Sequence, residues 1–80
     1  MALTISVVPV GDGWAVRSDG FDNEMVFQAG AKAEAAARAL ARRYAAQGVS
    51  AEVAIFLRDG ALAGRFLHAA PSRALDLISA

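Results

Sequence analysis

Apolar and polar residues alternate at the start of the chain, which is the pattern of half-buried β-strands. Bulky aliphatic side chains occupy every second position of residues 3–7, and we expect Pro9 to end the pairing of this strand. After a glycine-rich turn at residues 11–13, Trp14 and Val16 share one face of a second alternating stretch. Residues 3–18 are therefore predicted to form a β-hairpin, with Trp14 as its core anchor.

A helix is predicted after a short apolar run. Residues 25–27 fit either a third strand or an edge leading into the helix, and residues 21–23 are expected to form a turn or loop. Residues 31–47 contain neither Gly nor Pro and consist mainly of strong helix formers, so we expect one long helix there, with Gly48 as its C-terminal cap. Its buried face is predicted to be rich in small residues, with Leu40 and Tyr44 as larger anchors: Ala33, Ala36, Ala37, Leu40, Ala41 and Tyr44.

A second hairpin is predicted after the helix, because residues 52–57 and 62–67 flank an Asp59-Gly60 turn. The expected fold class is α+β, with an antiparallel sheet of about four strands and one long helix on one face, in the order β-β-(β)-α-β-β. This single domain covers residues 1–70. Residues 71–80 are expected to be a short helix, a mobile tail or an arm over a neighbouring chain.

The sheet face opposite the helix is expected to be uncovered and partly apolar. In the second hairpin, Ala54 and Phe56 alternate with aliphatic residues, so both faces carry apolar side chains. Either the tail or another chain must cover the open face. The predicted interface therefore combines Ala54 and Phe56 with Leu75 and Ile78 of the tail.

Composition favours a small domain that associates with a copy of itself. The chain has 80 residues, of which 20 are Ala, so its bulky core is modest and pairing would stabilise it. The absence of cysteine excludes disulfides, thiolate metal sites and a cysteine nucleophile, and fits a cytoplasmic location. No signal-peptide pattern or membrane-length apolar run occurs. A homodimer, or a complex with a protein partner, is the hypothesis.

Several segments together resemble a known family. They are Val7-Val8-Pro9, residues 11–17, Val26-Phe27, the Lys32-Ala33-Glu34-Ala35 start of the helix, residues 39–42 and Arg58-Asp59-Gly60. They resemble the small bacterial and phage proteins grouped as domain of unknown function 2188, over most of residues 5–65. The resemblance implies a compact ββαββ domain and no particular activity. Ala31 departs from the family pattern, which has a capping Thr there.

The chemistry-bearing residues do not assemble into a catalytic pattern. His68 is the only histidine, and no orienting partner for it is evident. The acidic residues Asp19, Asp22 and Glu24 have the spacing of a solvated loop and not of a calcium loop. The turn at residues 11–13 joins two strands, whereas a phosphate cradle needs a following helix. We therefore expect no enzyme, cofactor or metal site.

Charge suggests one alternative function. Residues 32–47 carry Lys32, Arg38, Arg42 and Arg43 against Glu34, a net charge of +3 on a chain whose Lys+Arg and Asp+Glu balance at 8 each. Such a stripe fits weak nucleic-acid binding, with Arg38, Arg42 and Arg43 on phosphates. The competing interpretation is a solvated helix face. The favoured function is a non-catalytic interaction module.

Overall fold

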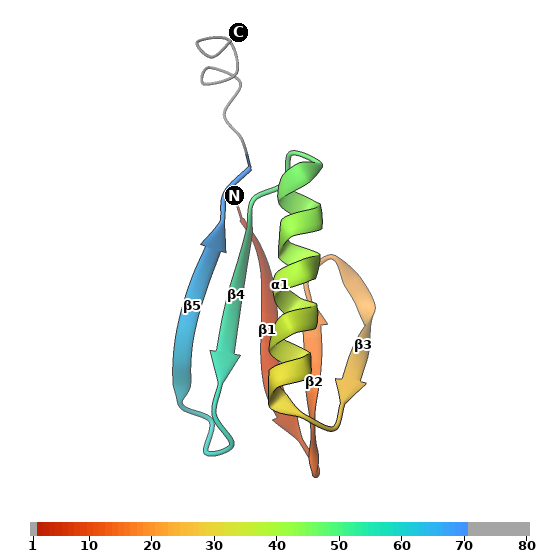
Figure 1. The fold of residues 1–80 in the computed structure, drawn as a ribbon, viewed down its shortest axis with the longest axis vertical. Coiled ribbons are helices and arrows are strands. Elements are labelled where there is room, and N and C mark those ends of the chain that lie inside the picture. Colours follow the sequence, from red (N-terminus) through yellow and green to blue (C-terminus); the bar gives the residue numbers. More distant parts are fainter. Residues whose placement is uncertain (1, 71–80) are drawn as a thin grey trace, which may run out of the picture.

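Five strands and one helix make up the described part of the chain (Figure 1). The computed structural model describes residues 2–70, without the side chains of residues 21–23. In chain order the elements are β1 (Leu3–Val10), β2 (Gly13–Ser18), β3 (Phe21–Phe27), α1 (Gly30–Ala46), β4 (Ala51–Phe56) and β5 (Leu62–His68). The α+β class is confirmed. The predicted tail, with Leu75 and Ile78, lies outside the described residues.

The sheet is mixed, which corrects the predicted antiparallel sheet of about four strands. Its five strands lie in the order β3-β2-β1-β4-β5, and β1 pairs with β4 in parallel while the other neighbours are antiparallel. The reason is the crossover through α1, which carries the chain from the β3 edge over β2 and β1 before β4 begins (Figure 1). The crossover is right-handed, as the twist of strands and helix favours.

Pro9 does not end the first strand, contrary to expectation, because β1 continues to Val10 and stays paired with β2. Successive residues of a strand direct their backbone N–H and C=O groups alternately toward the two neighbouring strands. Leu3 directs its groups toward the β4 side, because its N donates to Ser50 O at 2.9 Å. Pro9 has the same parity, so its nitrogen faces the β4 side. The last β1–β4 pair is at Val7. The missing N–H therefore costs no hydrogen bond to β2.

The short apolar run at residues 25–27 belongs to a third strand, and residues 21–23, expected as a turn or loop, already lie in it. The turn comes two residues earlier, because Ser18 pairs with Phe21 across Asp19 and Gly20. Gly20 N donates to Ser18 Oγ at 3.0 Å, which fixes this tight turn. The chain thus needs no further loop before β3.

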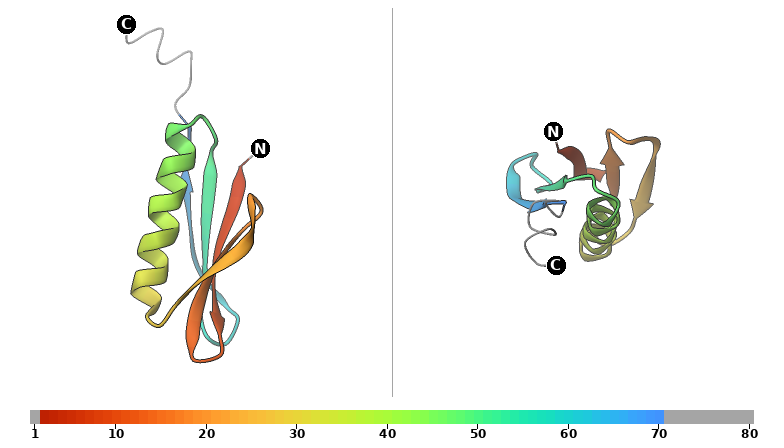
Figure 2. Two further views of the ribbon diagram at one scale, coloured as in Figure 1. Left: turned by 90° about the vertical axis from the view of Figure 1, so that its right-hand side faces the viewer. Right: turned by 90° about the horizontal axis from the view of Figure 1, so that it is seen from above.

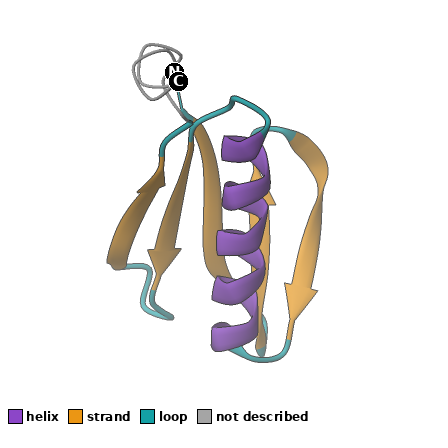
Figure 3. Ribbon diagram, turned by 45° about the horizontal axis from the view of Figure 1, so that its top comes forward, coloured by secondary structure: helices purple, strands orange, loops and turns teal. Residues whose placement is uncertain are grey.

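The helix packs its alanine face against one side of the sheet (Figure 3). Ala33, Ala37 and Ala41 are fully buried, as predicted. Because these side chains are small, the helix axis lies close to the strands, and the largest fully buried side chains come from the sheet: Ile5, Val7, Val16 and Val53. Partly buried Trp14, Leu40 and Tyr44 pack around this core, which confirms Trp14 as a core residue.

Gly48 caps the helix as predicted. Its φ of +91° is in the left-handed region, its N donates to Ala45 O at 3.0 Å, and Val49 N donates to Tyr44 O at 2.9 Å. This pair of bonds is the Schellman motif. At the other end, Ala29 precedes the helix without a side-chain cap, because alanine has no hydrogen-bonding side chain.

The second hairpin is confirmed, with a turn built on Asp59 and Gly60. Leu57 N donates to Ala61 O at 2.8 Å, and Gly60 has a φ of +89°. Asp59 Oδ1 also accepts from Ala61 N at 2.9 Å. A glycine in the left-handed region is what a short loop followed by a bulge requires.

Candidate interaction surface

The two faces of the sheet differ in cover. The helix lies on one face and the opposite face, here called the outer face, is free of other described elements (Figure 2). The predicted interface residues Ala54 and Phe56 lie on this outer face. Ala54 is only 4% exposed and Phe56 is half-buried, because neighbouring strands already cover them. Ala54 therefore offers little side-chain surface to another chain.

Charged pairs interrupt the outer face. Arg17 Nε lies 2.6 Å from Glu24 Oε2 between β2 and β3, and Arg65 Nε lies 3.7 Å from Glu52 Oε1 between β4 and β5. Each ion pair joins two neighbouring strands, and the polar residue Ser6 on β1 lies between the two ion pairs. A dry stack of two outer faces would bury these charges, which is costly.

Exposed apolar side chains gather instead at β5 and the turn before it. Four of the seven large apolar residues that are exposed in the described structure lie there, namely Leu57 (48%), Leu62 (45%), Phe66 (39%) and Leu67 (64%). We call these four residues the β5 edge surface. It lies at the free edge of the sheet, on the left in Figure 1.

Along the edge that faces away from β4, the β5 backbone has no partner strand within the described structure. Leu3 N donates to Ser50 O, so the even-numbered residues of segment 50–56 direct their backbone N–H and C=O groups toward β1. The odd-numbered β4 residues direct theirs toward β5, where they form hydrogen bonds with Phe66 and its even-numbered neighbours. Ala63, Arg65 and Leu67 consequently direct their N–H and C=O groups away from the sheet. Such an edge is a template for another strand.

The opposite edge, β3, is less regular. Its register with β2 shifts between Val16 and Ser18, so regular pairing covers only residues 25–27, whereas β5 pairs regularly with β4 over residues 64–68. Met25 and Val26 are exposed on it. So short a regular stretch gives another strand few positions to pair with.

Arg38 connects the helix to β5. Its guanidinium carbon lies 4.0 Å from the centre of the Phe66 ring, and its Nε lies 3.2 Å from Glu34 Oε2. Glu34 and Arg38 thus form an i, i+4 ion pair along the helix. Stacking and ion pairing hold the guanidinium over one side of the Phe66 ring, which fixes the ring at the sheet edge.

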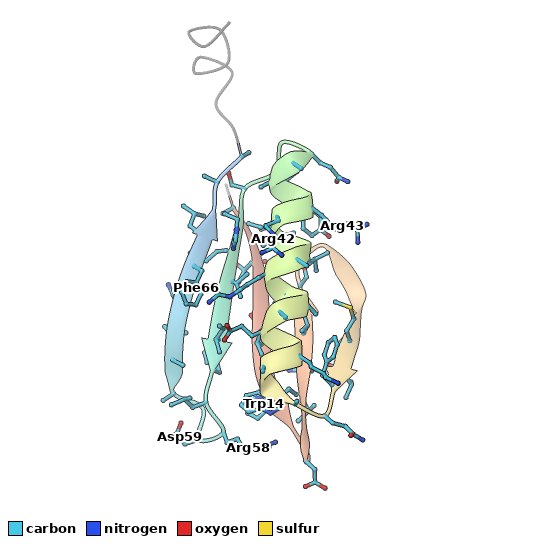
Figure 4. The ribbon with its side chains drawn as sticks, in the orientation of Figure 1. Trp14, Arg42, Arg43, Arg58, Asp59 and Phe66 are labelled. Atoms are coloured by element: carbon cyan, nitrogen blue, oxygen red, sulfur yellow. The ribbon has the colours of Figure 1, made fainter. Side chains whose placement is uncertain are left out.

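The three predicted phosphate-binding arginines do not form one row. Arg38 leans over β5, whereas Arg42 lies on the side of α1 away from the sheet and Arg43 points toward the β3 side (Figure 4). Arg42 and Arg43 are exposed. Arg43 lines an open pocket along the helix with Leu40, Tyr44 and Gln47.

Sequence reasoning missed the role of Arg58, which it assigned only to a turn. Its guanidinium donates to Gly11 O at 3.0 Å and to Asp12 O at 2.8 Å, and its carbon lies 4.9 Å from the centre of the Trp14 ring (Figure 4). The contact joins the two hairpin turns. No local pattern signals it, because the partners are 46 and 47 residues apart.

The remaining titratable residues stay apart in the described structure. His68 is half-buried at the end of β5, opposite Ala51. Among the side chains that the structure describes, those of residues 2–20 and 24–70, no group of three or more His, Asp or Glu is placed to hold a metal ion. The one described helix is neither long nor apolar enough to cross a membrane.

Comparison with known proteins adds no relative to this description. No protein-family model, no curated protein and no solved structure matches the chain. The resemblance to domain of unknown function 2188 stays a prediction from the sequence. Function must be argued from the surface itself.

Proposed function

We propose that the protein is a non-catalytic interaction module that self-associates through the β5 edge surface. The observation that carries this proposal is the concentration of exposed apolar side chains on a strand whose outward backbone groups have no partner in the described structure. Burying apolar area contributes roughly 25 cal/mol per Å². The β5 edge surface is thus the place where contact with another chain gains most.

The modest core supports the same proposal. Within the described structure, four large side chains are completely buried, Ile5, Val7, Val16 and Val53, and the helix contributes alanines to the centre of the core. Small domains with such cores commonly gain stability from oligomerisation. The balanced charge of 8 Lys+Arg and 8 Asp+Glu leaves no net repulsion between two copies.

The resemblance and the composition extend the proposal. We place the chain among small bacterial proteins like those of domain of unknown function 2188, in the cytoplasm, where a cysteine-free protein needs no oxidising environment. No step of the proposed function uses a cofactor. The partner is a second copy of the chain, and a different protein partner is an outcome of the test below.

Size-exclusion chromatography with light scattering tests self-association directly. At micromolar concentration we expect a species of twice the chain mass of 8.3 kDa. A species of the chain mass at all concentrations up to about 100 μM would refute self-association, because such a dimer would be weaker than about 5–6 kcal/mol. Adding a mixed pool of short DNA and RNA to the same run tests the second candidate.

The second candidate is weak nucleic-acid binding, which the exposure of Arg42 and Arg43 favours. Two neighbouring exposed arginines fit phosphate contacts, whose affinity falls as salt rises. The variant Arg42→Glu/Arg43→Glu is expected to abolish any shift with the nucleic-acid pool. Absence of a shift for the unaltered protein at low salt would contradict this candidate.

A further inference from the structure

We propose that two copies pair antiparallel through their β5 strands, around a twofold axis beside Phe66, to give one continuous sheet with both helices on the same face. This inference rests on the proposed self-association and specifies its geometry. The partner is a second copy of this chain. The inference follows from the register of β5, the direction of its backbone groups and the charges along it.

The regular part of β5 sets the centre of the contact. The β4–β5 register shifts between Ile55 and Phe56, so Leu62 lies beyond an irregularity, while pairing is regular from Gly64 to His68. Phe66 is the middle residue of this regular stretch. A symmetric antiparallel pairing of the regular stretch with its copy therefore centres on Phe66.

The outward backbone groups fit this register. Arg65 and Leu67 point their N–H and C=O groups away from β4 and flank Phe66. Centred on Phe66, Arg65 lies opposite the partner's Leu67, and the two residues exchange both hydrogen bonds. A register centred on Arg65 would place this arginine opposite the partner's Arg65, and like charges directly opposite are destabilising.

The side chains fit as well. Phe66 lies opposite the partner's Phe66 in a non-hydrogen-bonded pair, where side chains approach most closely. Each ring is held by Arg38 of its own chain, 4.0 Å away, and is 39% exposed. The Leu67 side chain, 64% exposed, gains cover from the aliphatic part of the partner's Arg65.

Symmetry favours β5 with β5 over β5 with β3. A contact between a β5 edge and a β3 edge leaves one free edge of each kind at the two ends of the assembly, so further chains add and a filament grows. A twofold contact between two β5 edges uses both β5 edges and gives a closed dimer. Regular β2–β3 pairing covers only residues 25–27, against residues 64–68 for β4–β5, so β3 offers a partner strand the shorter regular edge. The surviving free edge of the dimer is thus the less regular one.

A proline at a β5 position whose N–H points away from β4 tests the β5–β5 pairing, and a matched proline on β3 is the control. Leu67→Pro removes an N–H that points away from β4, so the hairpin keeps its own bonds while the pair with the copy is lost. Val26→Pro is the control, since Val26 has the same 64% exposure and lies on β3 with its N–H also pointing away from the sheet. By light scattering and sedimentation, we expect Leu67→Pro to raise the dimer Kd at least about tenfold and Val26→Pro to leave it unchanged.

The outcomes separate this inference from the proposed function. If the unaltered chain is monomeric, self-association itself fails. If it is dimeric and Leu67→Pro, folded by circular dichroism, dimerises as tightly as the control, the chain self-associates but the β5 pairing is overturned. If Leu67→Pro does not fold, the cross-linking experiment below decides.

Cysteine cross-linking tests the register, because the chain contains no cysteine of its own. Phe66→Cys places two thiols opposite each other at about 4.5 Å between Cα atoms, within reach of a disulfide. Met25→Cys, on the β3 edge with 38% exposure against 39% for Phe66, controls for random collisions. The oxidation is run at a protein concentration above the dimer Kd of Phe66→Cys, so that this variant is dimeric. We expect Phe66→Cys to form a covalent dimer at least about tenfold faster than Met25→Cys. Equal rates in the two variants, with dimerisation intact, would overturn the pairing centred on Phe66.

Discussion

Arg58 joins the two hairpin turns at the level of a single side chain. Its guanidinium spans the β1–β2 turn, donating to Gly11 O and Asp12 O, and stacks on Trp14. Trp14 in turn lies against Gly30, where a Cβ would come within 3.1 Å of the indole. One corner of the molecule is therefore held by an arginine, an indole and a glycine that the sequence separates widely.

Arg58→Lys tests the importance of the guanidinium. Lysine keeps the charge but lacks the planar fork that reaches two carbonyl oxygens and the indole at once. We expect the free energy of unfolding in urea to fall by about 1 kcal/mol. Arg42→Lys, an exposed change on the helix with a similar helix propensity, is the control and should change stability by less than about 0.5 kcal/mol. Equal effects of the two substitutions would contradict a specific role for Arg58.

Gly30→Ala tests the packing of the helix start on Trp14. Alanine usually stabilises a helix relative to glycine, but here its Cβ would lie 3.1 Å from Trp14 Cε2 and 3.2 Å from Nε1. We expect a net loss of about 1 kcal/mol and a shifted emission of the single tryptophan.

The Trp14→Phe background provides the control for Gly30→Ala. Phenylalanine lacks the indole atoms nearest the new methyl group, so the penalty should disappear there if the clash is its cause. A double-mutant cycle in urea measures this coupling. A penalty of the same size in both backgrounds would assign the cost to the backbone instead.

At the level of elements, α1 depends on its buried alanines. Ala37 is fully buried in the core between α1 and the sheet, whereas Ala35, two residues earlier on the same helix, is exposed. We expect Ala37→Leu to lower the free energy of unfolding by about 1–3 kcal/mol, because the larger side chain has no space. Ala35→Leu should change it by less than about 0.5 kcal/mol in thermal or urea unfolding. Tolerance of leucine at position 37 would mean that the helix lies farther from the sheet.

Local patterns specify the elements well and their arrangement less well. The helix was predicted within one residue at each end, and both hairpins and the cap at Gly48 are confirmed. The parallel pairing of β1 with β4 was not predicted, because strand order depends on the path of α1 and not on alternation. Pro9 was expected to end β1, and only the direction of its nitrogen, which depends on the neighbouring strands, shows why it does not.

At the level of the whole molecule, the sequence pointed to an apolar surface but only partly to its place. Phe56 was singled out because both faces of its strand are apolar, yet exposure depends on which strands lie at the sheet edges, and β4 is an inner strand while β5 is an edge. Leu67 and Phe66 are exposed for this reason. Arg38 was considered with Arg42 and Arg43 from helical spacing, but spacing does not show that its guanidinium stacks on Phe66.

The response of association to salt distinguishes the two functions proposed for the molecule. A contact made of backbone hydrogen bonds and apolar side chains, between chains of zero formal net charge, should be almost insensitive to screening. We expect the dimer Kd from sedimentation equilibrium to change less than about threefold between about 50 mM and about 500 mM NaCl. Phosphate binding through Arg42 and Arg43 would weaken by at least about tenfold over the same range. A dimer that dissociates as salt rises would mean that charged groups hold it, which the apolar β5 edge surface does not allow.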